Sequence, residues 1–471
     1  MKISFHGAAR TVTGSKHLLT TDDGQKILLD CGMFQGLGRD TAPLNADFGF
    51  SPEQVDAVLL SHAHIDHSGL LPKLIKEGFR GKIYCTPATK ELTDILLHDS
   101  AEIQAYEAEH FAKKGMDHEP LYLPADVEET MKHFITVEFD EWFQLSDTIS
   151  FLFTNTGHLV GSAAISLTIK EDHETVRLLY SGDVGKYRSI LLQAPAEAPQ
   201  ADYIILESTH GNKHHDISFN TIETLHQWIK KVCVAKGGQI IIPAFSVGRT
   251  QEVLYALNQL SLEKRLPDIP VFVDSPLSLK ATQTIKHYKD QFNDRLQQVL
   301  RVDDDPFDFP GLKHIETVEE SRKLVDYEGP CVIISASGTA DAGRVRHHIN
   351  SCIAKENCAV LLVGYCGIKS LGGQLAEGAK EVEIFGEPCA VKAEVGQVHG
   401  MSAHGDTDDL CRFIANQDTD TVRQIFLVHG EYPVQKAFCD RLGLKGFKNV
   451  EVPAQHEQVE LGSRKLKERA A

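Results

Sequence analysis

Four residues with metal-binding side chains lie within six positions in the first part of the chain. They are His62, His64, Asp66 and His67, in the pattern HxHxDH. Imidazole and carboxylate groups belong to the ligand set that zinc favours in proteins. The alternation lets His62 and His64 face one metal ion while Asp66 and His67 turn to a neighbouring one. An isolated histidine is more often a surface or core residue, but four such residues in one short run predict a metal site.

Three further ligand-type residues follow apolar segments elsewhere in the chain. They are His158, Asp183 and His429. Each is expected at the carboxyl end of a strand, where open α/β sheets place their ligands. Taken singly, each has a structural alternative, which for Asp183 is a turn residue after a glycine. Their common placement favours a site with two metal ions.

Glu207 and His404 fit proton transfer better than metal binding. Glu207 ends the apolar run 203–206, and His404 lies in the segment 401–406 before an expected helix. A positioned histidine is the most frequent side chain in general acid–base catalysis, and a carboxylate partner tunes it. The structural alternatives are a helix or turn cap for Glu207 and a solvated loop residue for His404.

Short strands with tight turns are expected in the first third of the chain. An apolar strand at 55–60 runs into the histidine cluster, and residues 69–77 have helical spacing of leucine and isoleucine. The cluster is therefore expected on a strand-to-helix loop. Helices are expected over about 89–115. Further strands are expected near 134–139, 149–154, 163–169 and 176–181.

Beyond residue 201 the pattern changes to strand, glycine-containing loop and helix. Apolar strands are expected at 239–242, 271–273 and 332–334, whereas 301–310 is expected to be a surface loop. This alternation is typical of βαβ units with a mainly parallel sheet. A chain of 471 residues also exceeds the size at which one hydrophobic core usually stops growing, so two domains are expected.

The composition is that of a soluble protein, with 42% hydrophobic and 24% charged residues. No apolar run approaches the ~20 residues of a membrane span, and the N-terminus lacks the features of a secretory signal. We therefore expect a cytoplasmic protein with no membrane partner. The 10 cysteines are scattered singly without a CxxC pair, and we interpret them as reduced packing residues.

The formal net charge of -18 argues against binding of nucleic acid over a broad basic face. Bound divalent ions can reverse the sign of the charge locally. A nucleic-acid substrate is therefore compatible with this chain only if a metal site attracts it.

Six motifs occur in this order along the chain: HAHIDH, TGHLVGS, SGDVG, LESTHG, SAHGD and LVHGE. Together they resemble the metallo-β-lactamase fold nucleases with a β-CASP insertion. That family includes the endonuclease of pre-mRNA 3′-end processing and bacterial and archaeal RNases. The resemblance extends from Gly7 to about Glu431. The first motif is shared with lactonases, glyoxalases and tRNA 3′ nucleases, and the later motifs point to the β-CASP branch.

The resemblance implies a fold and a ligand set. The fold is an α/β protein with an αββα sandwich, formed by residues 1–208 and 380–471, and an inserted parallel-sheet β-CASP domain at 209–379. Two zinc ions per chain are implied, with Asp183 shared between them. The first ion is held by His62, His64, His158 and Asp183, and the second by Asp66, His67, His429 and Asp183. The β-CASP signature positions are Glu207, His404 and His429.

A mechanism follows from the resemblance as a hypothesis. Two zinc ions bridge a hydroxide that attacks the phosphorus of single-stranded RNA bound in a cleft between the domains. His404 protonates the departing oxygen, and Glu207 accepts its other ring N–H. Asp66, Glu207 and His404 are the expected catalytic residues.

Phosphate contacts are expected from Ser335, Ser337 and Arg344, and for the arginine the structural alternative is a salt bridge on an acidic surface. Their loop follows a strand and offers backbone N–H groups to an oxyanion. It reads SGTADAGR, whereas family members usually read close to SGMATGGR. This difference from the family sequence bears on which substrate the protein prefers, more than on the reaction that it catalyses.

Several alternatives stay open. The chain could act on DNA, or as a lactonase, thioesterase or β-lactamase on a small substrate, although the long insertion and the His404–Glu207 pair favour a phosphodiester. A non-catalytic scaffold is disfavoured because every expected ligand is present. Internal cutting, 5′–3′ exonuclease action and a homodimer all remain open.

Overall fold

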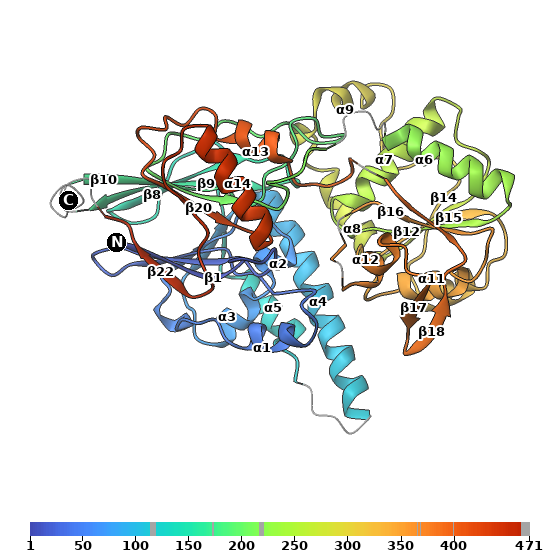
Figure 1. The fold of residues 1–471 in the computed structure, drawn as a ribbon. Helices are drawn as coiled ribbons and strands as arrows, with labels where there is room; N and C mark the ends of the chain where they lie inside the picture. Colours follow the sequence, from blue (N-terminus) through green and yellow to red (C-terminus); the bar gives the residue numbers. More distant parts are fainter. Residues whose placement is uncertain are drawn as a thin grey trace. The chain divides into compact units, whose positions relative to one another are not determined.

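The computed structural model describes residues 1–113, 119–171, 174–215, 221–364, 366–367, 369–398 and 400–462. The chain forms two compact units (Figure 1). Unit 1 comprises Met1–Arg188, Ala194–His214 and His404–Ala471, and unit 2 comprises Ser189–Gln193 and His215–Ala403. Every predicted metal ligand, together with Glu207 and His404, belongs to unit 1.

Unit 1 is built on two seven-stranded sheets. The first has the order β22 (Glu457–Glu460), β1 (Lys2–Gly7), β2 (Lys16–Thr20), β3 (Lys26–Leu29), β4 (Ala57–Leu59), β5 (Lys82–Cys85) and β6 (Phe134–Thr136). The second has the order β21 (Val450–Glu451), β20 (Gln424–Val428), β11 (Tyr203–Glu207), β10 (Glu174–Tyr180), β9 (Ala163–Glu171), β8 (Ile149–Asn155) and β7 (Phe143–Gln144).

The helices of unit 1 cover the outer faces of these sheets. They are α1 (Thr41–Ala46), α2 (Ile65–Ser68), α3 (Leu71–Lys76), α4 (Pro87–Lys113), α5 (Pro124–Met131), α13 (Thr407–Phe413) and α14 (Tyr432–Leu444), with 3-10 turns at Gly38–Asp40 and Pro52–Gln54. One core lies under α3, α4 and α5 on the first sheet, and another lies under α13 and α14 on the second. A third core fills the space between the sheets. The predicted αββα sandwich is therefore confirmed.

Strand β11 shows how the sequence produces this layering. Successive side chains of a strand point to opposite faces of its sheet. Tyr203 and Ile205 belong to the core between the sheets, whereas Ile204 and Leu206 belong to the core under the helices. A strand buried on both faces must be apolar throughout, which explains why Glu207 is the first charged residue after this run.

Parallel pairing brings the carboxyl ends of several strands to common edges. In the second sheet β10, β11, β20 and β21 pair in parallel, and in the first sheet β3, β4, β5 and β6 do so. The histidine cluster follows β4 and includes α2, as predicted. The helical spacing at 69–77 corresponds to α3, which begins at Leu71 with a proline in its first turn, while Gly69 caps the preceding helix α2.

Unit 2 contains a six-stranded, fully parallel sheet, as the alternation of strand and helix predicts. Its order is β14 (Leu312–His314), β13 (Val271–Asp274), β15 (Cys331–Ser335), β12 (Gln239–Pro243), β16 (Ala359–Leu362) and β19 (Glu394–Gln397). A separate hairpin joins β17 (Glu381–Ile384) and β18 (Glu387–Ala390). The predicted loop at 301–310 lies between helix and strand without regular structure of its own.

The helices of unit 2 alternate with these strands along the chain. They are α6 (Thr221–Ile229), a π-helical segment (Lys230–Ala235), α7 (Arg249–Leu262), α8 (Pro276–Ile285), a 3-10 turn (Lys289–Gln291), α9 (Asp294–Val299), α10 (Val318–Val325), α11 (Val345–Cys352) and α12 (Leu371–Ala376). Across the described ranges, no helix combines the length and apolar character of a membrane span.

The boundaries of the units differ from those expected. Residues 380–403 were assigned to the first domain, but the second unit continues to Ala403. The reason is β19, which pairs in parallel with β16 and so extends the sheet of unit 2. This edge strand has the sequence EVGQ, which is too short and too polar to indicate a strand. The chain enters unit 2 briefly at Ser189–Gln193, which the sequence did not indicate, and its main crossing to unit 2 lies at His214–His215, close to the expected 208–209.

Candidate metal centre

The first predicted ligand set converges at one edge of unit 1. His64 Nδ1 lies 3.1 Å from His62 Nε2 and 3.2 Å from His158 Nε2. Asp183 Oδ2 lies 3.5 Å from both His62 Nε2 and His158 Nε2. A tetrahedral zinc ion with bonds of about 2.0–2.1 Å separates neighbouring ligand atoms by roughly 3.3–3.4 Å. These four separations are therefore close to those in a tetrahedral zinc site, and all four ligand atoms lie within 4.8 Å of one another.

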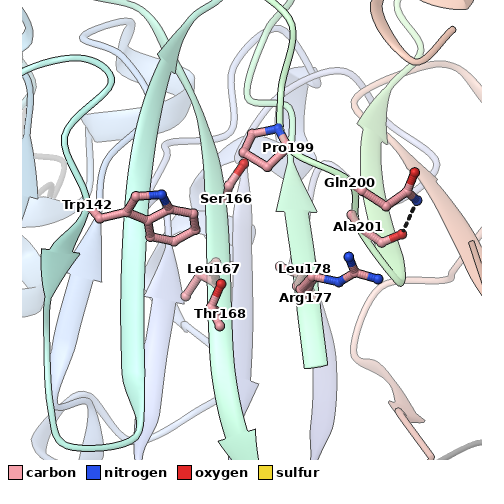
Figure 2. A pocket seen from close by; sticks show the side chains of 9 residues that line it. All are labelled: Trp142, Ser166, Leu167, Thr168, Arg177, Leu178, Pro199, Gln200 and Ala201. Atoms are coloured by element: carbon pink, nitrogen blue, oxygen red, sulfur yellow. Dashed lines mark hydrogen bonds between the residues drawn. The ribbon is translucent and has the colours of Figure 1, made fainter. Parts of the chain in front are cut away.

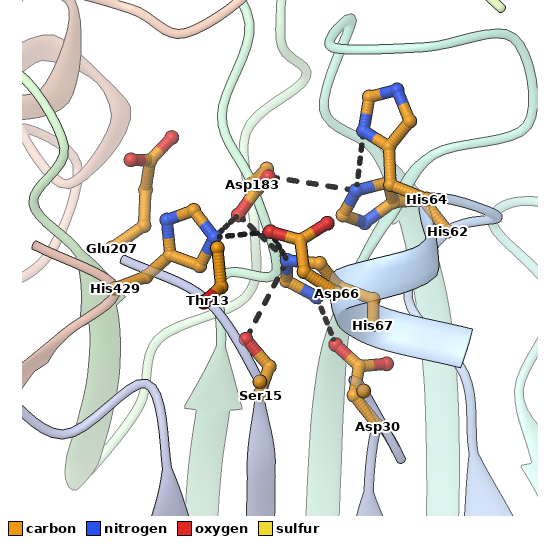
Figure 3. A network of polar contacts seen from close by, with 12 residues as sticks. Thr13, Ser15, Asp30, His62, His64, Asp66, His67, Asp183, Glu207 and His429 are labelled. Carbon is orange, nitrogen blue, oxygen red and sulfur yellow. Dashed lines mark hydrogen bonds and ion pairs between the residues drawn. The ribbon is translucent and has the colours of Figure 1, made fainter. Parts of the chain in front are cut away.

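The second predicted set lies directly beside the first (Figure 3). His429 Nε2 lies 3.3 Å from Asp66 Oδ2, and His67 Nε2 lies 4.0 Å from the same oxygen. Asp183 Oδ1 is 3.3 Å from His67 Nε2 and 3.6 Å from His429 Nε2. Asp183 thus presents one carboxylate oxygen to each set, which is the geometry expected of a ligand shared between two cations.

The protonation of His62, His158 and Asp183 also fits metal binding. Burial lowers the pKa of His62 and of His158 well below the usual value, so both rings are neutral and have a lone pair to donate. Burial raises the pKa of Asp183, but His429 and His67 more than offset this and hold it well below the usual value. Its Oδ1 is buried without a hydrogen-bond donor, which a bound cation would remedy.

Asp30 supports the centre from behind and is missing from the sequence-based site. It is fully buried and follows β3. His67 Nδ1–H donates to Asp30 Oδ2 at 2.6 Å, and the hydroxyl groups of Tyr180 and Ser61 donate to the same oxygen at 2.6 and 2.7 Å. This contact directs His67 Nε2 toward Asp183 and fixes the ring tautomer.

The signal for Asp30 was present in the sequence. An aspartate at the end of the apolar run 27–29 satisfies the same strand-end criterion that selected His429. Other supporting contacts come from hydroxyl groups. Ser61 Oγ lies 3.0 Å from His62 Nδ1, and Thr209 Oγ1 lies 2.9 Å from His429 Nδ1.

His404 and Glu207 are brought together as predicted. Gly405 N donates to Val184 O at 2.7 Å, which fixes the His404 loop beside the Asp183 loop. His404 Nδ1 is 3.0 Å from Glu207 Oε1, and Glu207 also accepts the backbone N–H groups of Val184 and Thr209 at 2.8 and 3.1 Å. Burial lowers the pKa of His404, but Glu207 and Asp183 outweigh it and raise the pKa to about 9. The imidazole is therefore protonated near neutral pH.

The same geometry permits a second interpretation of His404. Ligand-type atoms of Asp183, Glu207, His404 and His429 also lie within 4.8 Å of one another, so this group could hold a cation. Glu207, however, is already held by two backbone donors and by the His404 ring. This arrangement favours the pair as proton-transfer machinery.

The predicted phosphate residues lie in unit 2 and are already engaged there. Ser335 is buried, and its hydroxyl donates to Asp274 O at 2.9 Å. Arg344 Nη1 is 2.7 Å from Asp274 Oδ1, and Arg344 also donates to the carbonyl group of Glu316 at 3.1 Å. Ser337 N donates to Ala342 O at 3.2 Å within its own loop. The structure thus gives Ser335 a role in packing that the sequence did not indicate, whereas the pairing of Arg344 with Asp274 is the salt-bridge alternative stated for that arginine.

A small pocket on the outer face of the second sheet is a weaker candidate (Figure 2). Its volume is about 140 Å³, and Trp142 lies over it. The nine lining residues include no histidine, cysteine or carboxylate. Its single charged residue, Arg177, is paired with Asp202 at 3.2 Å. This pocket therefore lacks the groups that hydrolysis requires.

Comparisons with protein-family models match three successive segments. Residues 14–207 match the metallo-beta-lactamase superfamily, residues 250–375 match the Beta-Casp domain, and residues 389–453 match the Zn-dependent metallo-hydrolase RNA specificity domain.

Similar proteins match over most of the chain. Ribonuclease TTHA0252 of Thermus thermophilus is 36% identical, covering 95% of this chain and 97% of the relative. The RNase J-like protein of Methanocaldococcus jannaschii is 31% identical, covering 91% and 92%. Transcription termination factor FttA of Methanosarcina mazei is 29% identical, covering 93% of this chain and 68% of the relative.

A solved structure shares the fold. The crystal structure of a protein of unknown function from Enterococcus faecalis V583 matches with a TM-score of 0.52 and 12% identity, covering 97% of this chain and 99% of that one. At this identity the likeness concerns the fold alone.

Proposed function

Because this chain belongs to the metallo-β-lactamase superfamily, in the branch that carries a Beta-Casp domain, we propose that it is a zinc-dependent ribonuclease that hydrolyses phosphodiester bonds of single-stranded RNA. The observation that carries the proposal is Asp183, whose two oxygens face two ligand sets beside a protonated histidine. Relatives named as ribonucleases and the match to an RNA specificity domain support RNA as the substrate.

Seven side chains would hold two zinc ions. The first set is His62, His64, His158 and Asp183, and the second is Asp66, His67, His429 and Asp183. When bound, the metal supplies Lewis-acid chemistry that stabilises charge on phosphate oxygens and lowers the pKa of the attacking water. A doubly charged cation also gives this acidic chain a local attraction for the RNA backbone.

His404 is the proposed general acid. Its Nδ1–H is held by Glu207, so the other ring nitrogen can present a proton to the departing ribose oxygen. Glu207 orients the ring and stabilises its charged form, and the backbone donors from Val184 and Thr209 fix Glu207 in turn. The exposed fraction of the His404 side chain is 18%, against 0% for Glu207, which supports His404 as the member of the pair that meets the substrate.

Three measurements test the proposal. Purified protein is incubated with end-labelled single-stranded RNA and DNA, with and without a chelator, and its zinc content is determined. We expect cleavage of RNA that stops on metal removal and returns with zinc. Equal cleavage with and without chelator contradicts the metal mechanism. If the protein cleaves only DNA, or hydrolyses only a lactone, then RNA is not its substrate. Mononucleotides released from the 5′ end indicate exonuclease action, and internal fragments indicate endonuclease action.

A further inference from the structure

Arg10 and Tyr432 form an exposed pair beside the metal centre. The Arg10 guanidinium carbon lies 4.8 Å from the centre of the Tyr432 ring, within the range of a cation–π contact. Arg10 Nη2 also donates to Val452 O at 3.1 Å. Both side chains are solvent-exposed, Tyr432 to 43%. The guanidinium is therefore held by the Tyr432 ring and by Val452 O, and the remaining N–H groups at its edge are open to a ligand.

The backbone ties this pair to the His429 ligand. His429 N donates to Ala8 O at 2.7 Å, and Gly430 N donates to Thr11 O at 3.2 Å, so the segment carrying Arg10 is hydrogen-bonded to the segment carrying His429. Tyr432 begins α14 directly after that segment. Arg10 also has a left-handed backbone, with φ 59°. Such a conformation is unfavourable for arginine, and residues strained in this way cluster at active sites and ligand clamps.

The strand order places the pair at the same edge as the catalytic groups. Val452, which accepts the Arg10 hydrogen bond, follows β21, and β21 pairs in parallel with β20, the strand directly before His429. Glu207 ends β11 on the other side of β20. Neighbouring strands are ~4.7–4.9 Å apart. The Arg10 anchor thus lies one strand beyond His429 along this edge, within reach of a nucleotide adjoining the one at the metals.

The hydrogen-bond donors of the Arg10 guanidinium favour a phosphate group as the ligand. Among the described residues, its Nε and Nη1 groups make no hydrogen bond to a protein acceptor, and their planar arrangement fits two oxygens of a phosphate. In contrast, Arg344 is paired with Asp274 and Arg249 is paired with Glu252. For a chain with a net charge of -18, a fixed cation next to the metals is a useful contact for a polyanion.

We propose that Arg10 binds the backbone phosphate of the RNA nucleotide next to the cleaved bond and that Tyr432 positions the Arg10 guanidinium. The proposal rests on the ribonuclease function proposed above. It names a substrate contact within unit 1, apart from the metal ligands and the His404–Glu207 pair.

The test compares a long and a small substrate. Steady-state kinetics are measured on a labelled single-stranded oligoribonucleotide and on bis(p-nitrophenyl) phosphate, which has no neighbouring nucleotide. Loss of a charge-assisted phosphate contact in Arg10→Ala is expected to raise KM for RNA roughly tenfold with little change in kcat. Turnover of the small diester should stay unchanged. The dependence of log KM on log salt should also become shallower, by about the slope of one phosphate contact.

Further variants separate contact from structure. Tyr432→Ala should raise KM for RNA less than Arg10→Ala does, and Tyr432→Phe should match the wild type because the aromatic face remains. Two control substitutions should leave the kinetic constants for both substrates unchanged. Lys448→Ala removes an exposed cation at the opposite end of β20 and β21, where Lys448 pairs with Asp420. Trp142→Ala removes an exposed aromatic residue on the outer sheet face (Figure 2).

The outcomes are distinguishable. An unchanged KM for RNA in Arg10→Ala, or an equal loss on RNA and on the small diester, overturns the Arg10 proposal. If Arg10→Ala also loses zinc or melts at a lower temperature, Arg10→Lys separates the two effects. If Arg10→Lys restores the stability but not the KM for RNA, the result supports a phosphate contact that needs the planar guanidinium. A wild-type protein that turns over the small diester but not RNA refutes the proposed function itself, whatever the variants do.

Discussion

Replacing Asp30 by asparagine tests whether the tautomer of His67 controls metal binding. In the native protein Asp30 Oδ2 accepts His67 Nδ1–H at 2.6 Å, and Oδ1 accepts Ser61 N–H at 2.6 Å. If the amide oxygen of asparagine keeps the Ser61 contact, its NH2 group faces the histidine ring. His67 then either loses its acceptor or moves its proton to Nε2, the atom that faces Asp183 and Asp66. Both results weaken a ligand of the second set.

The magnitude follows from the lost contact. A hydrogen bond to a charged acceptor contributes about 1.5–3 kcal/mol, and about 1.4 kcal/mol corresponds to a tenfold change in a binding constant. We therefore expect the zinc affinity of the second set to fall roughly tenfold to hundredfold, as is typical for partners of metal-binding histidines. The hydroxyl groups of Tyr180 and Ser61 can rotate to accept from the amide, so the fold should persist.

The assay is competitive zinc titration against a chromogenic chelator, combined with zinc content after dialysis. Circular dichroism and the melting temperature of the metal-free protein check the fold. A matched control is Asp94→Asn, which makes the same chemical change at a half-buried position whose ion-pair partner is His98 on the same helix. A zinc affinity of Asp30→Asn equal to that of the wild type, in a folded protein, would refute the reasoning that Asp30 sets the His67 tautomer.

Three further predictions concern other parts of the structure. His404→Ala should lower kcat by about 10²–10⁴-fold and leave zinc content unchanged; a loss of zinc on this change would make His404 a ligand. Asp183→Asn should reduce zinc binding in both sets, because each uses one Asp183 oxygen; loss of a single ion, measured by elemental analysis, would contradict the sharing. Burial raises the pKa of Asp274, but His348 and Arg344 are among the donors that lower it below the usual value. Ionised Asp274 should therefore stabilise unit 2 above a pH of ~3.9 and lose this contribution as the pH falls. Asp274→Ala should lower the unfolding free energy by about 3–5 kcal/mol, since it leaves buried partners unpaired. Chemical denaturation at several pH values checks both statements, and a pH-independent difference from the wild type would contradict the first.

Local patterns were sufficient to predict much of the centre. The cluster His62–His67 follows a short apolar strand and enters α2, and both features are visible as residue types within a short window. Glu207 and His429 could be predicted for the same reason, because a strand buried on both faces is apolar until the chain leaves the sheet. The family resemblance is confirmed by the matches to the metallo-beta-lactamase, Beta-Casp and RNA specificity models.

Predictions based on a residue type alone were less successful. Arg344 has the charge and the loop position of a phosphate ligand, yet Asp274, seventy positions earlier, occupies its guanidinium. Arg10 has no sequence motif of its own, and its proposed role depends on a carbonyl at Val452 and a ring at Tyr432. Strand β19 was missed because its pairing with β16, rather than its own composition, makes it a strand.

The sequence by itself determined which side chains are able to bind metal and transfer protons, and at which strand ends they stand, because residue type and hydrophobic periodicity are local properties. Tertiary structure alone decided how these groups share their contacts. The two oxygens of Asp183 face different ligand sets, Asp30 holds His67 from behind, and Arg344 is committed to Asp274 while Arg10 faces solvent. Each of these contacts joins segments far apart in the chain, so its formation depends on sheet order and packing that no single window of sequence contains.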